Sequence, residues 1–113
     1  MINVTHQSLL ALPEQLTYTG LNGDDFSETE KFNLPEIVRA MCWIREFCSP
    51  SRSFNSRSSY AIKHMMERDI GDYVCNGTAI AAFILSGYEW KPAGDEYNPN
   101  AYFKVQINKK EEF

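Results

Sequence analysis

The sequence has no apolar run long enough to cross a membrane. Its longest apolar stretch covers residues 79–85, whereas a transmembrane helix needs roughly 18 or more residues. No basic segment followed by an apolar one opens the chain, so no signal peptide is predicted. Only three cysteines are present, Cys42, Cys48 and Cys75. An odd number of cysteines without a secretory signal predicts reduced thiols and a cytoplasmic protein.

The sequence also lacks the motifs of common enzymes and metal sites. It contains no phosphate-binding loop, dinucleotide fingerprint, nucleophile elbow or zinc pattern. Its only histidines are His6 and His64, and no three or four ligands have the spacing of a metal site. We therefore expect no catalytic residues, no metal and no cofactor.

What the chain does contain is ordinary globular material with an uneven charge. Its 113 residues are 43% hydrophobic and 13% aromatic, which predicts a single domain over residues 1–113. The net charge of −4 divides into −5 for residues 1–38, +4 for 39–68 and −3 for 69–113. So acidic a chain is a poor general binder of duplex DNA. Its basic middle either contacts phosphate locally or is simply a solvated surface of mixed charge.

Two segments in the middle of the chain have helical periodicity. The first begins after the capping residue Asn33, with Glu36 three positions on as in a capping box, and ends at residues 49–50. The second spans residues 59–70 and is closed by Gly71. The apolar positions expected to face the core are Leu34, Ile37, Val38, Met41, Ile44 and Cys48 in the first helix, and Ile62, Met65, Met66 and Ile70 in the second.

A third helix is predicted over residues 77–86, with Asn76 as its cap and Gly87 as its end. Its body is apolar nearly all round, which is typical of a helix at the centre of a domain. We expect three of its large side chains to be buried: Ile80, Phe83 and Ile84.

Alternating residues after this helix predict two half-buried strands, at 88–91 and 102–107, joined by a loop that contains two prolines. Residues 1–32 are only weakly patterned, residues 33–87 form the helical core, and residues 88–108 form the hairpin. The predicted fold class is α+β: a three-helix core with a helix-turn-helix-like pair, followed by a C-terminal β-hairpin.

This order of elements matches a winged helix-turn-helix, in which the last helix of the pair enters the major groove of DNA. The helix in that position offers almost no side chains that read base edges. A nucleic-acid-binding regulator is therefore the alternative interpretation, and a structural helix pair is the favoured one.

The densest polar cluster lies on the second helix, where residues three and four positions apart share one flank. The second candidate is the serine-rich loop of residues 49–59, whose two arginines can contact phosphate. The residues predicted to bind a partner are Arg52, Arg57, Tyr60, Lys63, His64 and Glu67. The competing interpretations are a hydrogen-bonded helix face, with Lys63 and Glu67 as an ion pair, and a solvated connection.

A third candidate is the acidic N-terminal part, which could occupy a basic groove on a partner or merely keep the chain soluble. Its acids before the first helix are Glu14, Asp24, Asp25, Glu28 and Glu30.

One segment covers about a quarter of the chain and reads Ser59-Tyr60-x-Ile62-Lys63-His64-x-x-Glu67-x-x-x-Gly71-x-Tyr73-Val74-x-Asn76-Gly77-x-x-Ile80-x-Ala82-x-x-x-x-Gly87-Tyr88. This segment resembles one found in small proteins of bacteriophages, plasmids and other bacterial mobile elements. Where the resembled segment has Ser-Asn-Gly followed by an acidic and an aromatic residue, this chain has Cys75-Asn76-Gly77-Thr78-Ala79.

The resemblance implies a context more than a chemistry. Small accessory proteins of mobile elements often regulate the element or inhibit a host defence system, and such inhibitors act by binding. We therefore expect a non-enzymatic, anti-CRISPR-like binding protein in the cytoplasm of a bacterial host. Its expected partner is a host protein or nucleoprotein complex, with nucleic acid as a further option and no membrane.

Overall fold

The computed structural model describes residues 2–22, 32–95 and 97–108. Within these residues the chain is a mixed α+β protein, as predicted. The elements in chain order are the 3-10 helix η1 (His6–Ala11), β1 (Leu16–Thr17), β2 (Gly20–Leu21), α1 (Leu34–Phe47), β3 (Cys48–Pro50), α2 (Ser59–Ile70), α3 (Asn76–Leu85), β4 (Trp90–Pro92), β5 (Ala101–Phe103) and β6 (Val105–Ile107). None of the helices in the described part is long and apolar enough to cross a membrane.

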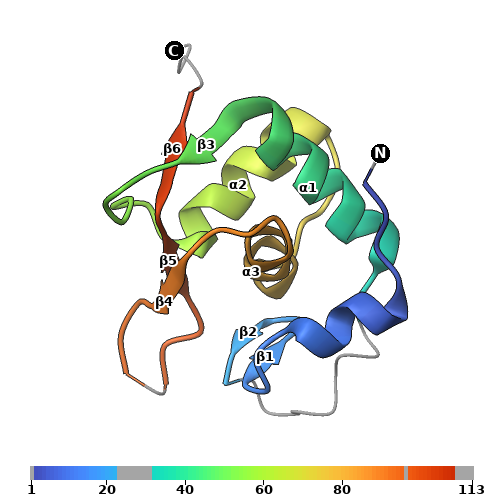
Figure 1. The fold of residues 1–113 in the computed structure, drawn as a ribbon, viewed down its shortest axis with the longest axis horizontal. Helices are drawn as coiled ribbons and strands as arrows, with labels where there is room; N and C mark the ends of the chain where they lie inside the picture. The colour runs from blue at the N-terminus through green and yellow to red at the C-terminus, as the bar shows by residue number, and fades with distance from the viewer. Residues whose placement is uncertain (1, 23–31, 96, 109–113) are drawn as a thin grey trace.

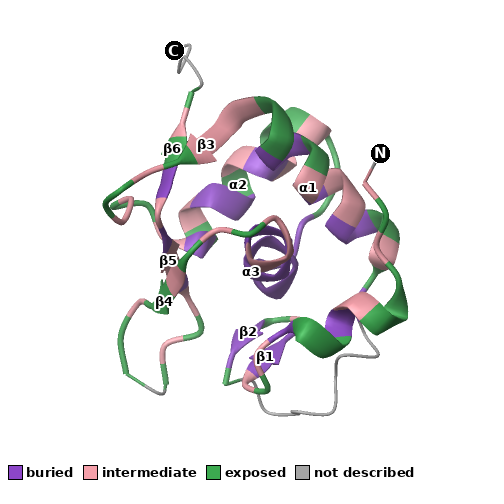
Figure 2. Ribbon diagram, in the orientation of Figure 1, coloured by how far each residue is buried: buried purple, intermediate pink, exposed green. Residues whose placement is uncertain are grey.

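Helix α3 lies at the centre of the molecule. Figure 1 shows it end-on, with α1 and α2 on one side and the β1–β2 pair on the other. Residues 76–83 are all buried (Figure 2). The ring of Phe83 stacks on Phe103 of β5, with ring centroids 4.2 Å apart, and meets Tyr88 edge-on. The prediction of a central third helix is confirmed, except that Ile84 is only half-buried.

The core face of α1 is rotated from the expected one. Ile37 and Ile44 are buried as predicted, but the other buried apolar residues of α1 are Ala40 and Trp43. Four members of the predicted stripe are only partly buried: Leu34, Val38, Met41 and Cys48. Trp43 belongs inside because its indole nitrogen has a partner, donating to Asp69 Oδ2 at 2.7 Å.

Two helix ends follow the local code of the sequence. Asn33 caps α1, because its side-chain oxygen accepts the Glu36 backbone N–H at 3.1 Å. Gly71 closes α2 in the left-handed conformation, with φ of 77°. The predicted capping box is wrong in one half, since the Glu36 carboxylate turns into the interior and bonds elsewhere.

The prediction that Asn76 caps α3 is also wrong. Cys75 occupies the cap position, and Asn76 is the first residue of the helix. The Asn76 amide instead donates to Pro99 O and to Asn100 Oδ1, each at 3.1 Å. Asn76 therefore attaches the start of α3 to the loop that precedes β5.

The predicted hairpin is present as the antiparallel pair β4–β5, with Trp90 opposite Phe103. The expected second strand is divided, however, and β6 leaves the hairpin to pair with β3, directly after α1. The change of partner occurs at Lys104, whose N–H donates to Glu89 O while its carbonyl accepts from Ser51 N–H. A strand with two successive partners satisfies its backbone groups on both sides of this bend.

The helix-turn-helix-like pair consists of α2, the link of residues 71–75, and α3. In a winged helix the second member of the pair reads DNA. Because residues 76–83 are enclosed by the rest of the fold, α3 has no free face to place in a major groove. The pair is a structural corner around the core.

Candidate functional site

The four residues predicted on the second helix form one cluster in the structure. His64 Nδ1 lies 3.0 Å from Glu67 Oε1, and Lys63 Nζ lies 3.3 Å from the same oxygen. The rings of Tyr60 and His64 meet edge-on, with centroids 4.5 Å apart. The predicted Lys63–Glu67 ion pair is therefore confirmed.

The sequence pattern predicted that Lys63 faces outward, but its side chain is buried. Its relative exposure is 7%, and its ammonium lies 4.9 Å from the ring centroid of Tyr73 and 5.6 Å from that of Tyr60. An ammonium held against aromatic faces and a carboxylate keeps its charge balanced without water. Lys63 is therefore the centre of the cluster and not its outer surface.

Tyr73 is a member of this cluster that the sequence pattern did not indicate. It lies in the α2–α3 link, and its hydroxyl donates to Cys75 Sγ at 3.7 Å. This hydrogen bond, together with burial of the hydroxyl, raises the pKa of Tyr73 to about 12. Tyr60 and Tyr73 stay 54% and 55% exposed, so two tyrosines held around Lys63 form the outer surface of the cluster together with the exposed His64. An aromatic residue in a tight link was the available sequence clue.

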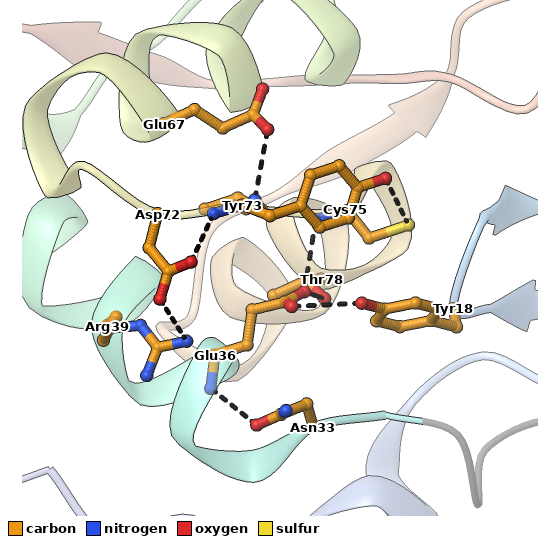
Figure 3. Close-up of polar contacts among 10 residues, drawn as sticks. Tyr18, Asn33, Glu36, Arg39, Glu67, Asp72, Tyr73, Cys75 and Thr78 are labelled. Atoms are coloured by element: carbon orange, nitrogen blue, oxygen red, sulfur yellow. Dashed lines mark hydrogen bonds and ion pairs between the residues drawn. The ribbon is translucent and has the colours of Figure 1, made fainter.

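Glu67 couples the cluster to the start of α3. Its second carboxylate oxygen accepts the Val74 backbone N–H at 3.3 Å (Figure 3). Both oxygens of Glu67 thus have partners, and the link that carries Tyr73 is fastened to α2. The surface formed by Tyr60, His64 and Tyr73, with Lys63 and Glu67 beneath it, is called the α2 surface below.

Arg52 and Arg57 belong to a different part of the molecule. Both are exposed and lie on the loop between β3 and α2. That loop is fastened to the strands, because Ser51 N–H donates to Lys104 O and Asn55 N–H donates to Phe103 O. The six residues predicted to bind a partner therefore divide into the α2 surface and this loop.

A second polar centre surrounds Glu36, and the sequence pattern did not indicate it. The carboxylate is buried and accepts hydrogen bonds from Tyr18 Oη at 3.0 Å, from Cys75 N–H at 3.2 Å and from the Thr78 hydroxyl (Figure 3). Burial of the phenol and its bond to Glu36 raise the pKa of Tyr18. These contacts join α1, the β1–β2 turn and the start of α3.

The acidic N-terminal face is largely outside the described residues. Asp24, Asp25, Glu28 and Glu30 lie in the part that the structure does not describe. Glu14 is exposed, whereas Glu36 is interior and cannot contribute to an outer acidic face.

The described residues contain no group of three or more His, Cys, Asp or Glu side chains placed to hold a metal ion. Comparisons with protein-family models, curated proteins and solved structures found no match to this chain.

Proposed function

We propose that this chain is a non-enzymatic binding protein of a bacteriophage or mobile element. It acts in the cytoplasm of a bacterial host by attaching to a protein or nucleoprotein complex of a defence system, as anti-CRISPR proteins do. The observation that carries the proposal is the pair of half-exposed tyrosines, Tyr60 and Tyr73, held around the buried Lys63 ammonium.

Such a surface has the chemistry of a protein-binding hot spot. Tyrosines are enriched among the few interface residues that contribute most of the binding free energy. The Lys63–Glu67 ion pair, the contact of Glu67 with His64 and its bond to Val74 N–H hold the α2 surface in place before a partner arrives. A preorganised surface loses less conformational entropy on binding, which favours affinity.

The same contacts argue for binding over catalysis. Both Glu67 oxygens are engaged in contacts within the protein, which favours a structural role for this carboxylate. The segment resemblance supplies the biological context, because it extends from Ser59 to Tyr88 and so includes the whole α2 surface.

The test is affinity capture of a tagged protein from a bacterial host that carries a CRISPR system, with quantitative mass spectrometry. Three forms are compared: the wild type, the double variant Tyr60→Ala/Tyr73→Ala, and the control Tyr97→Ala, which removes a tyrosine that is 84% exposed elsewhere. We expect a defence component to be retained by the wild type and the control and lost by the double variant, with similar melting temperatures.

A parallel assay measures phage plating on the same host. Expression of the wild type or Tyr97→Ala should raise plating efficiency, and expression of the double variant should not. A double variant that protects phage and captures the same protein as the wild type would contradict the proposal.

A further inference from the structure

A second surface lies on the loop that carries Arg52 and Arg57. The ring of Phe54 is near two ammonium groups: Lys91 Nζ of β4 at 4.5 Å and Lys104 Nζ at 5.3 Å from its centroid. Lys91 Nζ also lies 6.0 Å from the ring centroid of Tyr102 in β5. Segments far apart in the sequence therefore bring cations and aromatic rings together.

The backbone of this surface is held by hydrogen bonds and not only by charge. Asn55 donates from its backbone to Phe103 O at 2.9 Å and from its side chain to Val105 O at 3.1 Å. Its side-chain oxygen accepts the Arg57 backbone N–H at 2.8 Å. The loop is thus fixed against β5 and β6 next to Phe54.

The surface is basic although the chain is acidic. Lys91 and Lys104 lie at the ring of Phe54, and Arg52 and Arg57 are exposed residues of the loop that carries this ring. Lys104 also pairs with Glu89 at 2.8 Å. Beside them is a hollow of about 370 Å³, lined by Phe54, Arg57, Gln106 and the polar side chains of Ser51, Ser53 and Asn55 among others. Hydroxyl and amide groups of this kind form hydrogen bonds with phosphates and with base edges.

We infer that this basic-aromatic surface, composed of Arg52, Phe54, Lys91, Tyr102 and Lys104 with the adjoining hollow, binds single-stranded nucleic acid. Single strands are bound by cations that follow the backbone and by aromatic rings on which bases stack. A base stacked on Phe54 takes the place of the Lys91 ammonium, which then meets a neighbouring phosphate.

A duplex fits this surface poorly. Stacking on Phe54 or Tyr102 needs an unpaired base, and a paired duplex keeps its bases covered. The enclosed α3 cannot supply a reading helix for the major groove. The inference goes beyond the proposed function, because it adds a second ligand on residues that the α2 surface does not contain.

The test is fluorescence anisotropy with a labelled 12-nucleotide single strand of mixed sequence, as RNA and as DNA, and with the matching duplexes, at two salt concentrations. The variant is Arg52→Gln/Lys91→Gln. The matched control is Arg45→Gln/Arg68→Gln, which removes two exposed arginines of α1 and α2 with the same change in net charge.

We expect the wild type to bind a single strand, as RNA, DNA or both, more tightly than the matching duplex. Arg52→Gln/Lys91→Gln should weaken binding about tenfold or more, because each lost cation removes a charge-assisted phosphate contact. Each phosphate contact on a single strand contributes about 0.7 to the slope of log K against log salt. The slope should therefore fall by about 1.4 in this variant and stay unchanged in the control.

Three results would overturn the inference: no single-strand binding by the wild type at low salt, equal affinity for duplex and single strand, or an equal loss in the arginine control. Tyr60→Ala/Tyr73→Ala should bind the oligonucleotide like the wild type. Since that variant is the one expected to lose the protein partner, failure of either proposal can be recognised separately.

Discussion

At the scale of single residues, Glu36 has a role that its neighbours in the sequence do not reveal. It is the only buried acid among the described residues, and its three donors lie in two segments that are far from it in the chain, the β1–β2 turn and the start of α3. A buried carboxylate is tolerated when hydrogen bonds replace its water. Removal of Glu36 leaves Cys75 N–H and two hydroxyls without their acceptor.

We predict that Glu36→Ala lowers the free energy of unfolding by about 3 kcal/mol, because each buried polar group left unpaired costs about 1–3 kcal/mol. Glu14→Ala, at an exposed acid, is the control and should change it by less than about 0.5 kcal/mol. Urea denaturation of both variants measures the difference. Similar small effects would mean that the Glu36 contacts do not hold the fold.

The raised pKa values of Cys48 and Tyr73 predict how stability changes at high pH. Burial raises the pKa of the Cys48 thiol to about 12 from 9.0, and the pKa of Tyr73 rises to about 12 from 10.0. At a pH between the ordinary pKa of each group and its raised pKa, the unfolded chain has lost protons that the folded protein keeps. The free energy of unfolding therefore falls as the pH rises through this range. Below pH 9 the folded and the unfolded protein both hold these protons, so the two groups cause no loss of stability there.

The measurement is urea denaturation at pH 8, 10 and 11.5. We expect stability to fall across this series in the wild type, and to fall less in Cys48→Ser because a serine hydroxyl does not ionise in this range. A parallel decline of the two proteins would show that the Cys48 thiol is not protected in the folded state.

At the scale of elements, the start of α3 is packed against the β1–β2 turn without space for another atom. The Gly77 N–H donates to Tyr18 O at 2.9 Å, and a Cβ atom at Gly77 would overlap the carbonyl groups of Thr17 and Tyr18. Asn76 and Gly77 thus serve two attachments, one to the loop before β5 and one to the β1–β2 turn. The Asn76-Gly77 pair therefore has a structural role in this chain.

We predict that Gly77→Ala destabilises the protein by more than about 3 kcal/mol, since backbone atoms and not a flexible side chain would have to move. Gly71→Ala is an instructive comparison. It places a side chain in open space and costs only the strain of a left-handed conformation, about 1 kcal/mol. Thermal unfolding of both variants ranks them, and a Gly77→Ala protein as stable as Gly71→Ala would refute the close packing.

At the scale of the whole molecule, the core joins the helices to the strands through Phe83 and Phe103. These stacked rings connect α3 to the strand that continues into β6, and both side chains are fully buried. Phe83→Ala should therefore cost about 3–5 kcal/mol, as expected for removal of an aromatic side chain from a packed core. Calorimetry or urea denaturation gives the value, and a cost below about 1 kcal/mol would place α3 outside the core.

The α2 surface connects folding to the proposed binding. Lys63 is buried and paired, so Lys63→Ala should lower the free energy of unfolding by about 1–3 kcal/mol as the cluster loses its central cation. His64→Ala removes an exposed member of the same cluster and should change it by about 0.5 kcal/mol or less. Melting temperatures of the two single variants distinguish these roles. Equal and small changes in melting temperature would contradict a buried, stabilising role of Lys63.

Local chemistry explains what the sequence by itself determined. The α+β class, the three helices, the Asn33 cap and the Gly71 end depend on residues within a turn or two of each other. The apolar body of α3 marked it as central because no other position could cover it on all sides. The Lys63–Glu67 pair followed from helical spacing alone.

Only the tertiary structure decided which polar groups are interior. Lys63 is buried because Tyr73 comes over it from the link, and Glu36 is buried because Tyr18 and Cys75 approach from other segments. The pairing of β6 with β3, and the meeting of Phe54 with Lys91 and Lys104, likewise join residues about 40 or more positions apart. Such contacts depend on how whole elements pack, and local periodicity carries no information about them.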